Sequence, residues 1–116
     1  VCGGRRGVME AAAKGCSRAR GAVLGILPSV DPSEANPWIT LPVVTGLGHL
    51  RNALVVLNAD AVLALPGGPG TLTELSFARL YRRPAVTVGF SETGFPRCDT
   101  PEDALDMIWP QPLPPQ

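Results

Sequence analysis

The chain has 116 residues, enough for one domain with a single hydrophobic core, and its ten basic and ten acidic side chains cancel. A net charge of zero argues against nucleic acid or an anionic membrane as partner, and the odd set Cys2, Cys16 and Cys98, without metal-ligand spacing, argues against a disulfide framework or a metal site. No apolar run approaches the ~20 residues of a membrane span and no signal peptide is recognisable, so we expect a cytoplasmic protein.

Apolar strands alternate with amphipathic helices along the chain. In chain order the predicted elements are a helix at 9–17, a strand at 22–27, a polar loop at 28–40, a short strand at 41–45, a helix at 47–58, a strand at 61–65, a helix at 71–81, a strand at 84–89 and a helix at 101–109. This alternation predicts an α/β fold, with a parallel sheet covered by helices on both faces. We expect one domain at 1–108, followed by a proline-rich tail at 109–116.

Two of the predicted helices carry expectations at single residues. In the helix at 47–58, the side chains expected to face the core are Leu50, Leu54, Val55 and Leu57. Thr100 is a plausible N-cap for the last helix.

A glycine-rich turn follows the strand at 61–65. The apolar run stops at Pro66, and Gly67, Gly68 and Gly70 precede a helical pattern that starts at Thr71. A strand, a glycine turn and a helix together present free N–H groups and the positive end of a helix dipole to an anion. The turn therefore predicts a phosphate or nucleotide site at 67–71.

Two common phosphate motifs do not fit this turn. A P-loop requires a lysine after the last glycine, and the dinucleotide fingerprint requires a third glycine where Thr73 stands. A second glycine-rich turn, at 3–7, also follows a strand end. Ligands of parallel sheets bind beyond the carboxyl ends of the strands, so we expect both turns at one ligand site.

The segment at 66–74 resembles the Pro-Gly-Gly-x-Gly-Thr-x-x-Glu signature of the Lonely guy (LOG) family, formerly called lysine decarboxylases, with every defined position filled. The similarity covers about residues 1–90 and is greatest to the branch that includes molybdenum-cofactor carriers. Further matching segments are Gly-Gly-Arg-Arg-Gly-Val-Met at 3–9, Gly-Ile-Leu-Pro at 25–28, Ala-Asn at 35–36, Thr-Gly-Leu-Gly at 45–48 and Leu-Arg-Asn at 50–52.

The resemblance implies a Rossmann-like fold, a further strand and helix ahead of Val1, and a homodimer or higher homo-oligomer. It implies a small-molecule partner, either a nucleotide or a phosphorylated pterin. The implied activity is cleavage of a nucleoside 5′-monophosphate into free base and ribose 5-phosphate, with no cofactor required. The alternatives are a non-catalytic carrier that binds molybdopterin or a nucleotide, and a remnant without activity.

The resemblance also assigns residues to the site. Gly67, Gly68, Gly70 and Thr71 would hold the phosphate. Arg51 and Glu74 would be catalytic, orienting the ribose and stabilising the transition state. Arg51 lies twenty-three residues before Glu74, the separation found in the family, although Leu50 and Asn52 replace the glutamate and lysine that flank the arginine in the enzymes.

Three of these assignments, those of Thr71, Glu74 and Arg51, have a structural alternative. Thr71 and Glu74 have the spacing of a capping box, in which Thr71 caps the helix and Glu74 reaches back to it from the first turn. Arg51 reads equally well as a surface arginine.

We expect the remaining candidates to contact the ligand as well. Asn52 retains hydrogen-bonding groups, and Gly4 and Arg5 belong to the turn at 3–7. Arg5 and Arg6 are either phosphate contacts or solvated loop residues.

Overall fold

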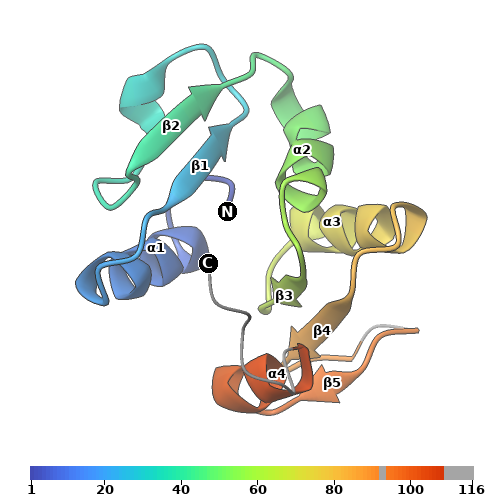
Figure 1. The fold of residues 1–116 in the computed structure, drawn as a ribbon. Coiled ribbons are helices and arrows are strands. Elements are labelled where there is room, and N and C mark those ends of the chain that lie inside the picture. The colour runs from blue at the N-terminus through green and yellow to red at the C-terminus, as the bar shows by residue number, and fades with distance from the viewer. Residues whose placement is uncertain (92–93, 109–116) are drawn as a thin grey trace. The chain divides into compact units, whose positions relative to one another are not determined.

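The computed structural model describes residues 1–91 and 94–108, so the predicted tail at 109–116 lies outside the described residues. The chain divides into two compact units, Val1–Asn58 and Ala59–Gln116. Both units combine helices with strands (Figure 1), and every strand pair in the described residues is parallel. The predicted α/β fold is therefore confirmed.

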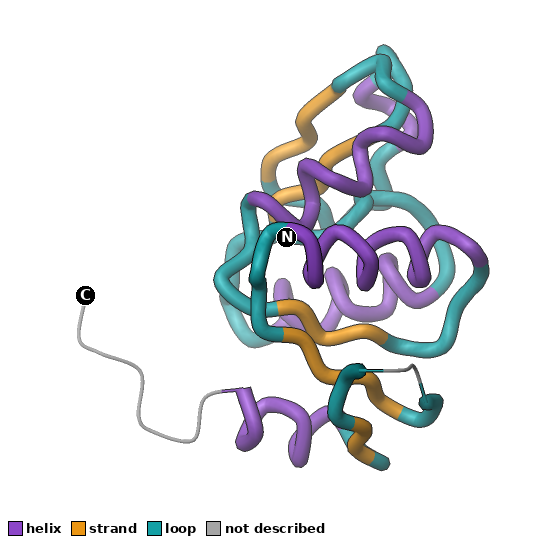
Figure 2. The backbone as a smooth tube through the Cα atoms, turned by 90° about the vertical axis from the view of Figure 1, so that its right-hand side faces the viewer, coloured by secondary structure: helices purple, strands orange, loops and turns teal. Residues whose placement is uncertain are grey.

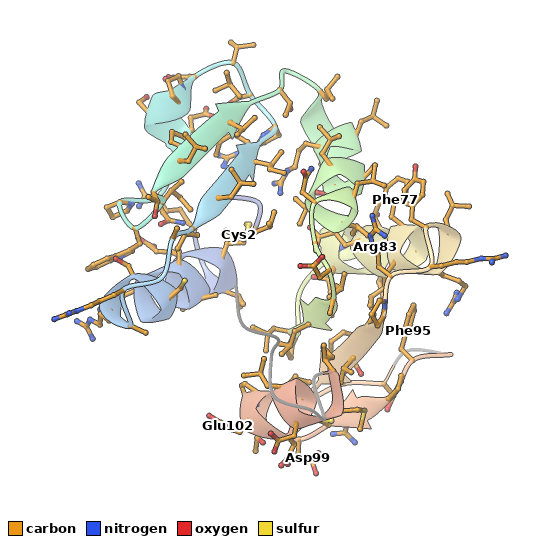
Figure 3. The ribbon with its side chains drawn as sticks, viewed as in Figure 1. Cys2, Phe77, Arg83, Phe95, Asp99 and Glu102 are labelled. Atoms are coloured by element: carbon orange, nitrogen blue, oxygen red, sulfur yellow. The ribbon has the colours of Figure 1, made fainter. Side chains whose placement is uncertain are left out.

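The first unit contains two helices and a small parallel sheet. In chain order these are α1 (Val8–Arg18), β1 (Leu24–Leu27), β2 (Leu41–Val44) and α2 (Arg51–Leu57), with 3₁₀ turns at Pro32–Glu34 and Gly48–Leu50. β1 pairs with β2 from Leu24↔Leu41 to Leu27↔Val44. Cys2, labelled in Figure 3, pairs with Gly25: its N–H donates to the Leu24 carbonyl at 3.0 Å and its carbonyl accepts from Ile26 at 2.9 Å. The chain entering the first glycine turn thus extends this sheet.

The core of the first unit lies around β1. Ile26 and Leu27 of this strand are buried, together with Ala13 of α1 and Val56 of α2. The burial of β1 explains its unbroken apolar sequence, as expected for a parallel strand covered by helices.

The predicted helix at 47–58 is shorter than expected, and its predicted buried face is confirmed only in part. Gly48 has a φ of 59°, and residues Gly48–Leu50 form a 3₁₀ turn before α2 begins. A 3₁₀ turn has 3.0 residues per turn, so it changes which side chains of the following helix face inward. Val55 is buried as predicted and Leu54 is half-buried, whereas Leu50 and Leu57 are exposed. Asn52 and Val56 are the further buried side chains of α2.

The second unit contains three short parallel strands and two helices. In chain order these are β3 (Val62–Ala64), α3 (Pro69–Leu80), β4 (Ala85–Val88), β5 (Arg97–Cys98) and α4 (Pro101–Ile108). The strand order is β3-β4-β5, and all of these strands are brief segments between loops in the backbone trace of Figure 2. The core consists of Val86, Val88, Cys98 and Ala104, with Leu63, Leu65 and Ile108 packed against it.

The predicted cap of α4 is confirmed. The Thr100 hydroxyl accepts from the Asp103 N–H at 3.1 Å, and Asp99 and Glu102 lie close to this end of the helix in Figure 3. Side-chain acceptance from the first turn satisfies a donor that the helix itself leaves unpaired.

The strand β5 was not predicted. It is two residues long, so it has no periodic pattern to detect. Hydrogen bonds from the neighbouring strand β4 hold it in place. The fully buried Thr87 of β4 donates its N–H to the Pro96 carbonyl at 2.9 Å, and the Gly89 N–H donates to the Cys98 carbonyl at 2.9 Å. The Thr87 hydroxyl also donates to the Phe90 carbonyl at 2.7 Å.

Within the described residues, no helix is both long and apolar enough to cross a membrane.

Candidate functional site

The glycine turn after β3 leads directly into α3. The helix begins at Pro69, two residues earlier than predicted, because proline has a φ suited to the first helical position and Gly68 serves as N-cap. No side chain caps this end. In the first turn Pro69 has no N–H and the Thr71 N–H donates to the Gly68 carbonyl at 3.1 Å, so Gly70 supplies the first-turn N–H without an acceptor among the described residues. The residues from Pro66 to Gly70 are all exposed. This end of α3 therefore offers the exposed Gly70 N–H and a positive dipole end to an anion.

The glycines of this turn have different roles. A Cβ on Gly67 would overlap the Thr71 hydroxyl, so only glycine lets that hydroxyl lie against the turn. A Cβ on Gly68 would meet nothing within 4 Å, which shows that space is open beside the N-cap. The Thr73 hydroxyl donates to the Pro69 carbonyl at 2.9 Å and is thus used inside the helix. Thr71 is the threonine placed at the turn.

The capping-box alternative for Thr71 and Glu74 does not hold. Thr71 is the third residue of α3 rather than its N-cap, and no side-chain cap is present. Glu74 consequently lies in the second turn, and the expectation of a first-turn carboxylate is wrong. The effect of the helix dipole falls off within the first turn, so it contributes little to the stability of the Glu74 anion. Residues three apart share a helix face, which places half-buried Glu74 one turn beyond Thr71.

In the first unit, Arg51 packs against the upstream glycine turn. A Cβ on Gly3 would overlap the Arg51 guanidinium and would lie 2.7 Å from the Met9 sulfur. Arg51 is half-buried and the adjoining Asn52 is buried. The guanidinium thus lies over the Gly3 backbone, rather than extending into solvent as the surface-arginine alternative requires.

Gly4 lies directly against β1. Its φ is 77°, and a Cβ there would lie 2.9 Å from the Leu27 Cδ2 and 3.2 Å from the Gly25 Cα. Both the conformation and the close backbone approach require glycine.

The two arginines of the turn differ in their partners. Arg6 donates to the Glu10 carboxylate at 3.1 Å, whereas the Arg5 side chain is exposed. Arg5 is therefore the arginine of this turn whose charge is not paired with Glu10.

Asn36 is a residue that sequence reasoning missed. It is 2 % exposed, and its backbone N–H donates to the Gly4 carbonyl at 2.8 Å while its side-chain Nδ2 donates to the Arg5 carbonyl at 2.8 Å. Its Oδ1 accepts from the Trp38 N–H at 3.0 Å. Asn36 lies in a polar loop without periodicity, so the matching Ala-Asn pair of the family resemblance was its only signal.

The structure thus divides the predicted residues between the two units. Gly4, Arg5, Arg51 and Asn52 belong to the first unit, and the motif from Gly67 to Glu74 belongs to the second. The described residues contain no group of three or more His, Cys, Asp or Glu side chains placed to hold a metal ion.

Solved structures with a similar fold include two proteins linked to the molybdenum cofactor. The molybdenum cofactor binding protein of Rippkaea orientalis is 32% identical, with a TM-score of 0.85 over 91% of this chain and 72% of its own. The molybdenum cofactor carrier protein of Chlamydomonas reinhardtii is 35% identical, with a TM-score of 0.69 over 78% of this chain and 56% of its own.

Curated relatives include an uncharacterized protein of Archaeoglobus fulgidus, 34% identical over 91% of this chain and 71% of the relative. A cytokinin riboside 5′-monophosphate phosphoribohydrolase of Rhodococcoides fascians is 32% identical over 78% of this chain, which spans 50% of that enzyme's length. These relatives confirm the resemblance to the LOG family and to its molybdenum-cofactor branch. The family model described as the SLOG cluster4 family matches residues 1–107, and the chain belongs to that family.

Proposed function

We propose that this protein binds a small molecule through a phosphate group, held at the start of α3 by Gly67, Gly68, Gly70 and Thr71. One observation carries the proposal: α3 begins at Pro69 without a side-chain cap, in an exposed glycine turn. The Gly70 N–H and the helix dipole favour an anion, and the Thr71 hydroxyl adds a donor beside Gly67.

The favoured ligand is a nucleoside 5′-monophosphate, and the proposed reaction is hydrolysis of its N-glycosidic bond. Glu74 lies three residues beyond Thr71, about 4.5 Å along the helix at ~1.5 Å per residue. A ribose attached to a phosphate at Thr71 would therefore lie alongside the Glu74 carboxylate. The carboxylate would stabilise the positive charge that develops at C1′ as the bond to the base breaks. Water then supplies the new C1′–O bond, and the departing base takes up a proton.

Arg51 would orient the ribose, and Gly4, Arg5 and Asn52 would contact the ligand from the first unit. The packing of Arg51 over Gly3 supports this role, since it holds the guanidinium at the glycine turn. This hydrolysis needs no metal or redox cofactor.

Incubation with a panel of nucleoside 5′-monophosphates, followed by chromatography of released base, tests the activity. We expect release by the wild type and none by Glu74→Gln, which keeps the side-chain shape and removes the charge. Glu102→Gln is the matched control, because Glu102 is an exposed carboxylate in the first turn of α4. Unchanged turnover in Glu74→Gln would refute the catalytic role.

A second candidate function is that of a molybdopterin carrier. Two observations favour it: the sequence Leu50-Arg51-Asn52 departs from the enzymes, and the molybdenum cofactor binding protein of Rippkaea orientalis aligns over 91% of this chain. The pterin phosphate would occupy the same turn at α3. Retention of added molybdenum cofactor by the wild type and its loss in Gly68→Asp, with no base release from nucleotides, would favour the carrier. Failure of the wild type to retain the cofactor would exclude the carrier function.

We further propose a cytoplasmic homodimer whose residues 1–108 unfold as one domain. Light scattering tests the dimer, and a single unfolding transition seen by two spectroscopic probes tests the domain. A monomeric mass would contradict the first proposal, and two separate transitions would contradict the second.

A further inference from the structure

We propose that Asn36 is a positioning residue that aims the backbone N–H groups of Arg5 and Arg6 at an oxyanion of the ligand. This inference deepens the proposed function and rests on it. It concerns the first unit alone, and it assigns a role to a residue outside both glycine motifs.

Asn36 holds two successive carbonyls of the turn. Its backbone N–H and its Nδ2 bind the Gly4 and Arg5 carbonyls, each at 2.8 Å, from thirty-one or more residues along the chain. The third bond, from the Trp38 N–H to Oδ1 at 3.0 Å, fixes the orientation of the carboxamide. Since Asn36 is 2 % exposed, water does not compete well for these bonds.

The direction of the carbonyls sets the direction of the donors. A trans peptide is planar, with its C=O and N–H pointing to opposite sides. The chain has no cis peptide among its described residues, so the N–H groups of Arg5 and Arg6 point away from Asn36. Within residues 1–91 and 94–108, no hydrogen-bond acceptor is found for either N–H.

The side chains around these two donors favour an oxyanion. Consecutive N–H groups on one side of a turn form an anion-binding concavity. The exposed Arg5 guanidinium belongs to the same turn, whereas that of Arg6 is paired with Glu10 at 3.1 Å. Two N–H groups and one cation match the oxygens of a phosphate or a carboxylate.

The turn is also held rigidly enough to keep this orientation. Gly4 packs on the Leu27 side chain and the Gly25 backbone, and the Arg51 guanidinium covers Gly3. Asn36 is the contact that selects which way the two peptides face, because the other contacts involve the neighbouring Cα atoms.

The test is an NMR titration of the ¹⁵N-labelled protein with adenosine 5′-monophosphate, with inorganic phosphate as a second probe. We expect the Arg5 and Arg6 amide resonances to shift in the wild type. In Asn36→Asp near pH 8 we expect affinity to fall about tenfold or more, because a carboxylate cannot donate to the Arg5 carbonyl. Burial raises the pKa of a carboxyl group, so lowering the pH to about 5.5 should protonate it and restore binding toward the wild-type value at that pH.

Asn58→Asp is the matched control. The Asn58 Nδ2 also donates to a backbone carbonyl, that of Leu54 at 2.7 Å, but at an exposed helix end. This variant should bind as the wild type does at both pH values. If Asn36→Asp fails to fold, Asn36→Ser replaces it as the test variant. Asn36→Ser should weaken ligand binding, and lowering the pH to about 5.5 should not restore it.

The outcomes separate this inference from the proposed function. Shifts at Gly70 and Thr71 without shifts at Arg5 and Arg6 would overturn the inference and leave the proposed function standing. Shifts at Arg5 and Arg6 alone would refute the phosphate site at α3 and, with it, the premise on which the inference rests. Shifts at neither turn would overturn both. Weak binding by Asn36→Asp that does not recover at low pH would reduce Asn36 to a structural role and overturn the inference.

Discussion

Replacing Gly4 with alanine should destabilise the first unit more than the same replacement at a left-handed glycine that has open space around it. Gly4 has a φ of 77°, and a left-handed conformation costs a non-glycine residue about 1–2 kcal/mol. The added methyl would also lie 2.9 Å from the Leu27 Cδ2 and 3.2 Å from the Gly25 Cα. Overpacking of this kind costs about 1–3 kcal/mol, which gives a total loss of about 2–5 kcal/mol.

Gly48→Ala separates the two contributions. Gly48 also has a left-handed φ, 59°, but an added Cβ there would meet nothing within 4 Å. The unfolding free energy lost in Gly48→Ala should be limited to the cost of the left-handed conformation, about 1–2 kcal/mol. Urea unfolding gives both free energies, and the m values should stay unchanged. Equal losses in the two variants would refute the close packing of the glycine turn on β1.

Three further substitutions test the elements around the site. Thr87→Val should lower the unfolding free energy by about 1–3 kcal/mol in urea unfolding, because it removes the buried bond to the Phe90 carbonyl; no loss beyond that of the exposed Thr73→Val would contradict this. Thr100→Ala should cost about 1 kcal/mol through the lost cap of α4, and a Tm equal to that of the wild type would count against it. Gly3→Ala should displace the Arg51 guanidinium and lower nucleotide affinity about tenfold in calorimetry, and wild-type affinity would show that Arg51 does not depend on this turn.

The sequence predicted most of the fold because the strands and helices have strong periodic patterns. The runs at 22–27 and 84–89 became β1 and β4, trimmed at their ends, and Thr100 capped α4 as expected. The errors lie where local geometry overrides periodicity. Gly48 introduced a 3₁₀ turn in which Leu50 is exposed, and the first-position preference of Pro69 moved the start of α3.

The same distinction applies to the site. The glycine motif at 66–74 is contiguous, so its position before a helix could be predicted. The start of that helix at Pro69 could not, and it decided that Thr71 is not a cap. Asn36 was missed because its role depends on bonds to Gly4 and Arg5, more than thirty residues away. Contacts at such separations leave no periodic trace in a single sequence.

Binding of a phosphate at the start of α3 is tested most directly by calorimetric titration of the wild type and of Gly68→Asp with adenosine 5′-monophosphate. Aspartate is a favourable N-cap, and the space beside Gly68 is open, so this variant should be at least as stable as the wild type. Its charge should nevertheless repel the phosphate and weaken binding by about tenfold or more, about 1.4 kcal/mol. Wild-type affinity in a stably folded Gly68→Asp would contradict a phosphate site at this helix.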